Sequence, residues 1–257
     1  ENKVLSYQEF LDDPTYYGEK VNGHQLSTDQ KLKKYLAFPG GVYVESGASA
    51  GVAGSNTKIF EDKFGWTGLL IEPCEEGYDS CSKTRPNSIS IHAALVSREF
   101  EGNEVYGDFG GSPSAYCTVG GWKWKKMMQN DPWLLSREMV HVPAATLTSI
   151  LEDHNIEKVD FWSLDIEGYE LQALEGLDFS RWKPKYILVE LLKFSDDPRT
   201  QWKVKDRSEC NFEEVSEYLS EIGYEEPINL TGYTHESHDQ WDGLRNDWLF
   251  KWGKDEG

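Results

Sequence analysis

The sequence has little positive charge and contains no long apolar run. Its 257 residues include 26 Lys and Arg against 45 Asp and Glu, which gives a net charge of −19. Such a surface repels nucleic acids and anionic membranes, although Trp122-Lys-Trp-Lys-Lys126 is a local basic exception. No stretch reaches the roughly 18 apolar residues that a membrane-spanning helix needs. We therefore expect no nucleic-acid partner and no membrane span.

The chain is also poor in cysteine and lacks a zinc-binding pattern. Its four cysteines show no CxxC spacing, so a zinc site is not expected. Free thiols in a reducing compartment and two disulfides both remain open. Nothing in the sequence resembles a secretory signal, so we expect a cytoplasmic protein. The length suits one domain over 1–257.

Apolar runs and helix-like spacings alternate along most of the chain. After a helical lead-in over 1–38, this alternation predicts a largely parallel sheet with helices on both faces, a doubly wound α/β fold. The alternation lapses over 97–137, where we expect a lid with a short helix at 122–128. The expected strands are 42–46, 68–72, 88–92, 138–142, 159–164, 186–191, 224–228 and 247–251. The expected helices are 29–36, 54–64, 75–83, 146–154, 168–175 and 212–222.

The stretch 42–56 is the most informative part of the chain. An apolar run meets Glu45 and then a loop of small residues with Gly47, Ala48 and Gly51, which predicts a strand, a tight turn and a helix. Glycines let the backbone turn sharply and pass close to a ligand. A carboxylate at this point repels phosphate and suits a cationic ligand. S-adenosylmethionine therefore fits better than a dinucleotide.

The same loop also resembles the glycine loop of short-chain dehydrogenases. Those enzymes need a Tyr-x-x-x-Lys pair downstream of the loop, and the only such pair here, Tyr16 to Lys20, lies upstream. An NAD(P)-dependent oxidoreductase is therefore the weaker alternative.

Four of the expected strands end in, or run into, an acidic residue. These residues are Glu45, Glu72, Asp165 and Glu190. Ligands of such sheets bind beyond the carboxyl ends of the strands, so four carboxylates at that edge indicate a site.

Several motifs in order resemble the FkbM family of S-adenosylmethionine-dependent methyltransferases. They are Gly41-Val-Tyr-Val-Glu-Ser-Gly-Ala, Ser55-Asn-Thr57, Gly65-Trp-Thr-Gly-Leu-Leu-Ile-Glu-Pro73, His92-Ala-Ala94, Val159-Asp-Phe-Trp-Ser-Leu-Asp-Ile-Glu-Gly168 and Asn246-Asp-Trp-Leu-Phe250. The resemblance spans roughly 25–252 and implies a seven-stranded doubly wound sheet with one antiparallel strand near the end. It also implies O-methyl transfer to sugars, polyketides or other hydroxylated metabolites. Ser46 and Ala50 depart from the family pattern.

The first part of the expected site holds the cofactor. We expect Glu45 to contact the methionine ammonium. Ser55, Asn56 and Thr57 open the following helix and would bind the methionine carboxylate, which the backbone N–H groups there also favour. Glu72 would hydrogen-bond the ribose hydroxyls, and Pro73 would end the strand. The expected cofactor-binding residues are Glu45, Gly47, Ala48, Gly51, Ser55, Asn56, Glu72, Pro73, Ala93, Ala94 and Asp165. Ala93 and Ala94 would leave room for adenine.

The second part of the expected site faces the acceptor. A hydroxyl acceptor must lose a proton, which requires a general base or a metal ion that lowers its pKa. We expect Asp165, Glu167 and Glu190 to be the catalytic residues, and Asp165 and Glu190 are candidate ligands for Mg²⁺. The alternative is that Asp165 contacts only the cofactor and Glu190 supports the structure.

The expected function is S-adenosylmethionine-dependent O-methyl transfer to a hydroxyl of a carbohydrate or similar small metabolite. The expected partner is accordingly a small-molecule or glycan acceptor. Trp122, Trp124 and Trp133 in the lid would either stack on sugar rings or pack the lid onto the body. A non-catalytic S-adenosylmethionine-binding or interaction domain is the main alternative from another class. Methylation of protein or RNA also stays open.

Overall fold

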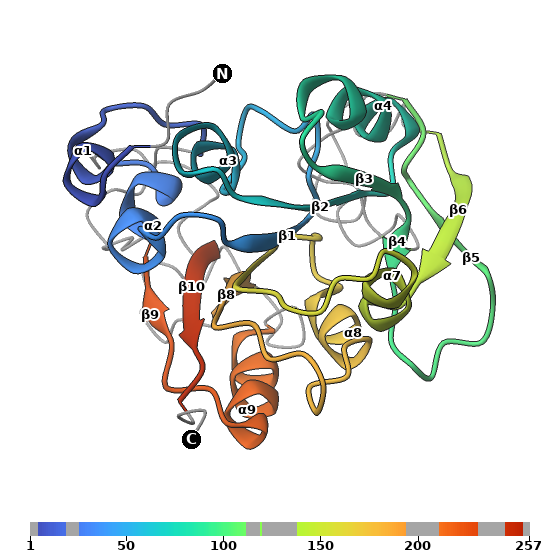
Figure 1. Ribbon diagram of the computed structural model, residues 1–257. Helices are drawn as coiled ribbons and strands as arrows, with labels where there is room; N and C mark the ends of the chain where they lie inside the picture. The colour runs from blue at the N-terminus through green and yellow to red at the C-terminus, as the bar shows by residue number, and fades with distance from the viewer. Residues whose placement is uncertain are drawn as a thin grey trace, which may run out of the picture.

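Seven strands form a central sheet in the order β3-β2-β1-β7-β8-β10-β9 (Figure 1). The computed structural model describes residues 5–18, 26–111, 119, 138–193, 211–230 and 245–253. The strands are β1 (Val42–Ser46), β2 (Thr67–Glu72), β3 (Ile89–His92), β7 (Phe161–Leu164), β8 (Tyr186–Leu192), β9 (Ile228–Asn229) and β10 (Arg245–Lys251). β10 runs antiparallel to β8 and β9, whereas the pairs from β3 to β8 are parallel. The expected seven-stranded sheet with one antiparallel strand near the end is confirmed.

Helices cover both faces of this sheet. They are α1 (Tyr7–Asp12), α2 (Thr28–Leu36), α3 (Lys58–Phe64), α4 (Glu75–Thr84), α7 (Leu147–Asp153), α8 (Glu170–Glu175) and α9 (Phe212–Ile222). Apolar residues of α1, α2 and α3 join one core cluster, whereas those of α7, α8 and α9 join another. The doubly wound α/β arrangement is therefore confirmed.

The strands alternate between these two clusters residue by residue. On β2, Leu69 and Ile71 face the cluster with α7, α8 and α9, whereas Leu70 faces the opposite cluster. All three side chains are at most 1% exposed. A parallel sheet covered on both faces needs such continuous apolar strands, which is why they are readable in the sequence.

A second, small sheet was not expected from the sequence. It contains β4 (Ala94–Leu95), β5 (Glu104–Gly107) and β6 (Val140–Ala145) in the order β4-β6-β5, and it lies next to the β3 side of the molecule (Figure 1). The strand expected at 138–142 corresponds to β6 and belongs to this sheet. Local alternation predicts a strand but does not identify its partners, which are distant in sequence.

Only part of the expected lid over 97–137 is described. That part includes β5, which pairs with β6. The helix expected at 122–128 lies outside the described residues, as do Trp122, Trp124, Trp133, the basic stretch at 122–126 and the cysteines at 117 and 210.

Two helices begin later than the spacing predicts. α3 starts at Lys58 instead of 54, because residues 51–57 form turns that hydrogen bonds hold in place. α8 starts at Glu170 instead of 168, because Glu167 and Gly168 have φ values of 60° and 97°, which a right-handed helix excludes.

The helices of the described residues differ from membrane-spanning helices. None of those helices combines the necessary length with the necessary apolarity.

Candidate active site

The glycine loop after β1 lies directly against the end of β7. Gly47 has a φ of 78°, and a Cβ atom on it would overlap with the backbone carbonyl oxygen of Asp165. The Asp165 N–H donates to the Ser46 carbonyl at 3.1 Å, which keeps the two segments together. Only glycine fits at position 47, because the backbone there is left-handed and because a side chain would overlap with Asp165. Gly47, predicted as a loop residue, therefore connects the residues expected to hold the cofactor with those expected to face the acceptor.

Glu72 ends β2 and faces the same loop. Its carboxylate accepts hydrogen bonds from the Ser49 N–H at 2.7 Å and from the Cys74 N–H at 2.9 Å. Ser49 has a φ of 50°, a left-handed conformation that costs energy in a residue with a side chain. Glu72 is 5% exposed, and its interaction with ribose hydroxyls stays a prediction.

Glu45 has partners that the sequence did not reveal. Its carboxylate accepts hydrogen bonds from Ser55 Oγ at 2.8 Å, Asn56 N–H at 2.8 Å and Thr57 Oγ1 at 2.6 Å. Glu45 is 4% exposed, so these groups satisfy it inside the protein. The N–H of Asn56, expected to bind the methionine carboxylate, is thus used by a protein carboxylate. Glu45 holds the turn that leads into α3.

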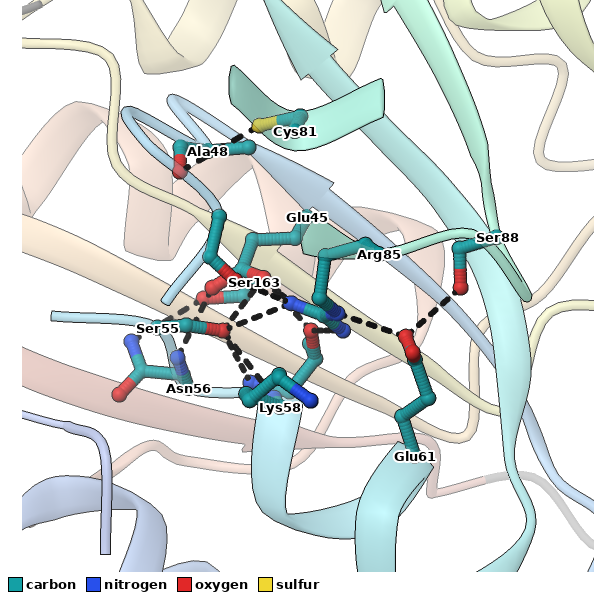
Figure 2. Close-up of polar contacts among 12 residues, drawn as sticks. Glu45, Ala48, Ser55, Asn56, Lys58, Glu61, Cys81, Arg85, Ser88 and Ser163 are labelled. Carbon is teal, nitrogen blue, oxygen red and sulfur yellow. Dashed lines mark hydrogen bonds and ion pairs between the residues drawn. The ribbon is translucent and has the colours of Figure 1, made fainter. Parts of the chain in front are cut away.

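Arg85 completes this buried group and was missed by the sequence reading. Its side chain is fully buried, and Figure 2 shows it between Glu61 and the turn that carries Ser55. Nε donates to Glu61 Oε2 at 2.6 Å, and Nη1 lies 3.6 Å from Glu45 Oε2. Burial alone lowers the pKa of Arg85, but Tyr43, Glu45 and Glu61 raise it overall, so the guanidinium stays charged. The signal for it in the sequence is indirect: buried acidic residues need a buried basic partner.

The unusual residue Ser46 has a structural explanation. Its Oγ accepts a hydrogen bond from the indole N–H of Trp162 on β7 at 2.9 Å, and both side chains are at most 1% exposed. A buried indole N–H needs an acceptor, which an aliphatic residue would not provide.

Cys81 on α4 lies beneath the glycine loop. Its Sγ contacts the carbonyl oxygen of Ser49 at 3.3 Å. Burial, with the nearby charges of Glu72 and Glu45, raises the pKa of Cys81 to about 12. The thiol is therefore protonated at neutral pH and supports the loop without acting as a nucleophile.

The two predicted alanines lie after β3. Ala93 and Ala94 are 3% and 6% exposed. Ala94 begins β4 and pairs with Ala144 of β6, so its small side chain also serves packing in the small sheet. Beside them, His92 Nε2 lies 2.9 Å from the carbonyl oxygen of Pro73. The adenine contact stays a prediction.

The three predicted catalytic carboxylates come together. Asp165 follows β7, Glu167 lies in the next turn and Glu190 lies on β8. Leu164 pairs with Val189, and this register brings Asp165 beside Glu190. One carboxylate oxygen from each residue lies within 4.8 Å of the others. Three carboxylate oxygens gathered in this way could hold a metal ion.

Glu170 supports the turn that carries Glu167. One of its oxygens accepts from the Gly168 N–H at 2.8 Å and the Ile166 N–H at 3.3 Å, while the other accepts from Asn211 Nδ2 at 2.7 Å. Glu170 is 1% exposed. It stabilises the left-handed conformation of Glu167 and was not singled out from the sequence.

The sheet order, the glycine loop after β1 and the acidic end of β2 define the class I fold of S-adenosylmethionine-dependent methyltransferases. Comparison with known families matches residues 45–226 to the methyltransferase FkbM domain. The chain belongs to the FkbM methyltransferase family, as the resemblance predicted. Membership implies S-adenosylmethionine as the methyl donor.

Solved structures resemble the chain at low sequence identity. FkbM from Methylobacillus flagellatus is 13% identical with a TM-score of 0.44, and the match covers 96% of this chain and 48% of that one. Precorrin-6y C5,15-methyltransferase from Geobacter metallireducens is 12% identical with a TM-score of 0.46, with coverages of 95% and 96%. No curated protein matches the chain.

Proposed function

We propose that the protein transfers a methyl group from S-adenosylmethionine to a hydroxyl of a carbohydrate or a similar small metabolite. The observation that carries the proposal is the group of Asp165, Glu167 and Glu190, whose oxygens lie within 4.8 Å of one another. This group lies beside the glycine loop, because Gly47 contacts the backbone of Asp165. A methyl donor on that loop would therefore lie close to carboxylates that can accept a proton.

The cofactor would lie along the loop from Gly47 to Gly51. Both glycines have left-handed φ values, 78° and 79°, which set the tight path of the loop against which the cofactor would lie. Glu72 would bind the ribose hydroxyls next to its contact with Ser49. Ala93 and Ala94 would border the adenine.

The residues of the protein would position the methyl donor and the acceptor and would take the proton from the acceptor hydroxyl. When bound, S-adenosylmethionine would supply an electrophilic methyl group, whose bond to the sulfonium sulfur breaks to give S-adenosylhomocysteine. As the new carbon–oxygen bond forms, the acceptor hydroxyl gives its proton to one of the three carboxylates. General base catalysis of this kind contributes about 10²–10⁴-fold in rate. Holding donor and acceptor in line contributes the rest.

The same carboxylates fit a divalent cation. Their donor set is oxygen only, which suits Mg²⁺, and Asp165 with Glu190 would hold it while Glu167 supports the turn or acts as the base. A cation there would lower the pKa of the acceptor hydroxyl. This part of the proposal is tested separately.

The first experiment is calorimetric titration with S-adenosylmethionine and S-adenosylhomocysteine. Micromolar binding, about −8 kcal/mol, supports the cofactor assignment. A parallel titration with NADP tests the oxidoreductase alternative, and binding of NADP alone would overturn our proposal. Repeating the titrations with EDTA and then with Mg²⁺ tests the metal: unchanged affinity and turnover in a metal-free sample would remove it.

The second experiment identifies the acceptor class by its product. Release of S-adenosylhomocysteine is measured with a panel of sugars and hydroxylated metabolites, their amine analogues, a mixed peptide library and RNA. Turnover on the hydroxyl panel but not on the amines supports O-methyl transfer. Cofactor binding without turnover on any acceptor would favour the non-catalytic domain, and turnover only on peptide or RNA would replace the acceptor class.

A further inference from the structure

We infer that Arg85 is a positioning residue of the cofactor site. Its guanidinium holds the segment from Gly51 to Thr57 in the shape that receives S-adenosylmethionine. This inference rests on the proposed cofactor binding, and it adds a residue from outside the sequence motifs. Arg85 caps the end of α4, the helix that follows β2.

Arg85 contacts the loop at three points. Nη1 donates to the carbonyl oxygen of Gly51 at 2.9 Å and to Ser55 Oγ at 3.2 Å, while Nη2 donates to Thr57 Oγ1 at 3.0 Å. These acceptors are spread from one end of the segment to the other, and Figure 2 draws the contact with Ser55. One planar group thus fixes the distance between the glycine loop and the start of α3.

The other side of the guanidinium is anchored in rigid elements. Nε donates to Glu61 on α3 at 2.6 Å, and Nη2 donates to the hydroxyl of Tyr43 on β1 at 2.6 Å. Ser88 Oγ also donates to Glu61 at 2.8 Å. The loop is therefore tied through Arg85 to the buried side chains of Tyr43 on a strand and Glu61 on a helix.

Arg85 also acts on the loop through Glu45. Its charge lies 3.6 Å from Glu45 Oε2, and Glu45 accepts from Ser55, Asn56 and Thr57. Burying a charged group costs free energy unless it is paired and hydrogen-bonded. Without Arg85, Glu45 would lose its positive neighbour.

A lysine cannot replace this arrangement. Arginine presents five N–H donors in a rigid plane, whereas lysine has three donors on one atom. The Arg85 stem also packs under the loop, since a Cβ on Gly51 would lie 3.2 Å from Arg85 Cγ. The Arg85→Lys variant would keep the charge and most of the stem but lose the simultaneous contacts with Gly51, Thr57 and Glu61.

The test compares Arg85→Lys with a control of similar structural cost. Val215→Ala removes two methyl groups from a fully buried side chain on α9, in the opposite core cluster. For each variant we would measure the melting temperature, the Kd of S-adenosylhomocysteine and, with an acceptor, KM for each substrate and kcat. Loss of the contacts should raise the Kd by about tenfold or more. KM for the cofactor should rise in parallel, while kcat at saturation and KM for the acceptor change little.

Thr57→Val keeps the proposal testable if Arg85→Lys does not fold. This near-isosteric change removes one acceptor of Arg85 and one donor to Glu45, so we expect about a threefold to tenfold higher Kd. The inference is overturned if the Kd of S-adenosylhomocysteine for folded Arg85→Lys lies within twofold of the wild-type value. If Arg85→Lys does not fold, the same criterion applies to Thr57→Val. The inference is also overturned if Val215→Ala weakens binding equally. Absence of binding by the wild-type protein would overturn the cofactor assignment itself, which distinguishes the two failures.

Discussion

The two halves of the candidate site arrange their carboxylates in opposite ways. On the cofactor side, Glu45 and Glu61 share the fully buried guanidinium of Arg85. On the acceptor side, Asp165, Glu167 and Glu190 gather carboxylate oxygens within 4.8 Å of one another. The first arrangement fixes a loop, whereas the second concentrates negative charge where the proposed reaction would remove a proton.

This difference separates acidic residues that stabilise the structure from acidic residues that are suited to proton transfer or metal binding. A buried carboxylate with several short hydrogen bonds and a positive neighbour has a stable charge. Carboxylates close together repel one another, so a proton or a cation between them is favoured. We therefore expect substitutions on the cofactor side to weaken binding and substitutions on the acceptor side to reduce turnover.

Asp165→Asn should have the largest effect that is confined to turnover. It keeps the shape of the side chain and the backbone contact with Gly47, but it removes one charge from the acceptor side. We expect kcat to fall by about 10²–10⁴-fold. The Kd of S-adenosylhomocysteine, measured by calorimetry, should stay within a few-fold of wild type.

Asp153→Asn is the matched control, because Asp153 is exposed at the end of α7. This variant should keep wild-type turnover. Near-normal activity in Asp165→Asn would remove Asp165 from the catalytic group and leave it as a cofactor contact.

Gly47→Ala tests the junction between the two halves. The new Cβ would meet the Asp165 carbonyl oxygen and would also require a left-handed backbone at φ 78°. We expect the free energy of unfolding to fall by about 3 kcal/mol or more, with loss of both cofactor binding and turnover. Chemical denaturation measures the first effect.

Gly40→Ala separates the two causes. Gly40 has a φ of 69°, and a Cβ there meets no atom within 4 Å. This control should lose only about 1–2 kcal/mol, the cost of the backbone conformation. Equal losses in both variants would show that the contact with Asp165 contributes nothing.

Glu72→Ala should weaken the cofactor side without altering the chemistry. The loop at Ser49 loses its acceptor, and the proposed ribose contact disappears. Charge-assisted hydrogen bonds of about 1.5–3 kcal/mol correspond to a tenfold or greater rise in the Kd of S-adenosylhomocysteine. Glu75→Ala removes an exposed charge three residues away and should leave the Kd unchanged. Unaltered affinity in Glu72→Ala would rule out the ribose assignment.

Much of the fold was predictable because its signals are local. Burial on both faces requires the continuous apolar runs of β2 and β8, and the left-handed backbone at 47 and 51 favours glycine. Both requirements are visible as residue types in the sequence. α9 has the predicted bounds because its apolar spacing is uninterrupted. The grouping of Asp165 with Glu190 was also predictable, since parallel strands place their carboxyl ends at one edge.

The parts that escaped prediction depend on contacts between distant residues. Arg85 lies 40 residues after Glu45, and no spacing rule links them. The expectation that Glu45 faces the ligand did not foresee that Ser55, Asn56 and Thr57 would occupy its carboxylate. The pairing of β4 with β6 joins segments about 50 residues apart, so only the tertiary structure reveals the small sheet.

Glu170→Gln should produce the smallest effect of these changes and should sharpen the contrast between the two halves. Glu170 accepts hydrogen bonds from the backbone of the turn through one oxygen and from Asn211 through the other. In the Glu170→Gln variant one of these oxygens would become an NH₂ group, which would face an N–H donor and could not accept its hydrogen bond. The left-handed conformation of Glu167 would then lose part of its support. We expect kcat to fall by about tenfold, equivalent to about 1.4 kcal/mol, with little change in the Kd of S-adenosylhomocysteine. Glu213→Gln, at an exposed position in the first turn of α9, is the matched control and should match wild type in both measurements. A higher Kd with unchanged kcat in Glu170→Gln would place this turn on the cofactor side, and the division between the two halves would have to be redrawn.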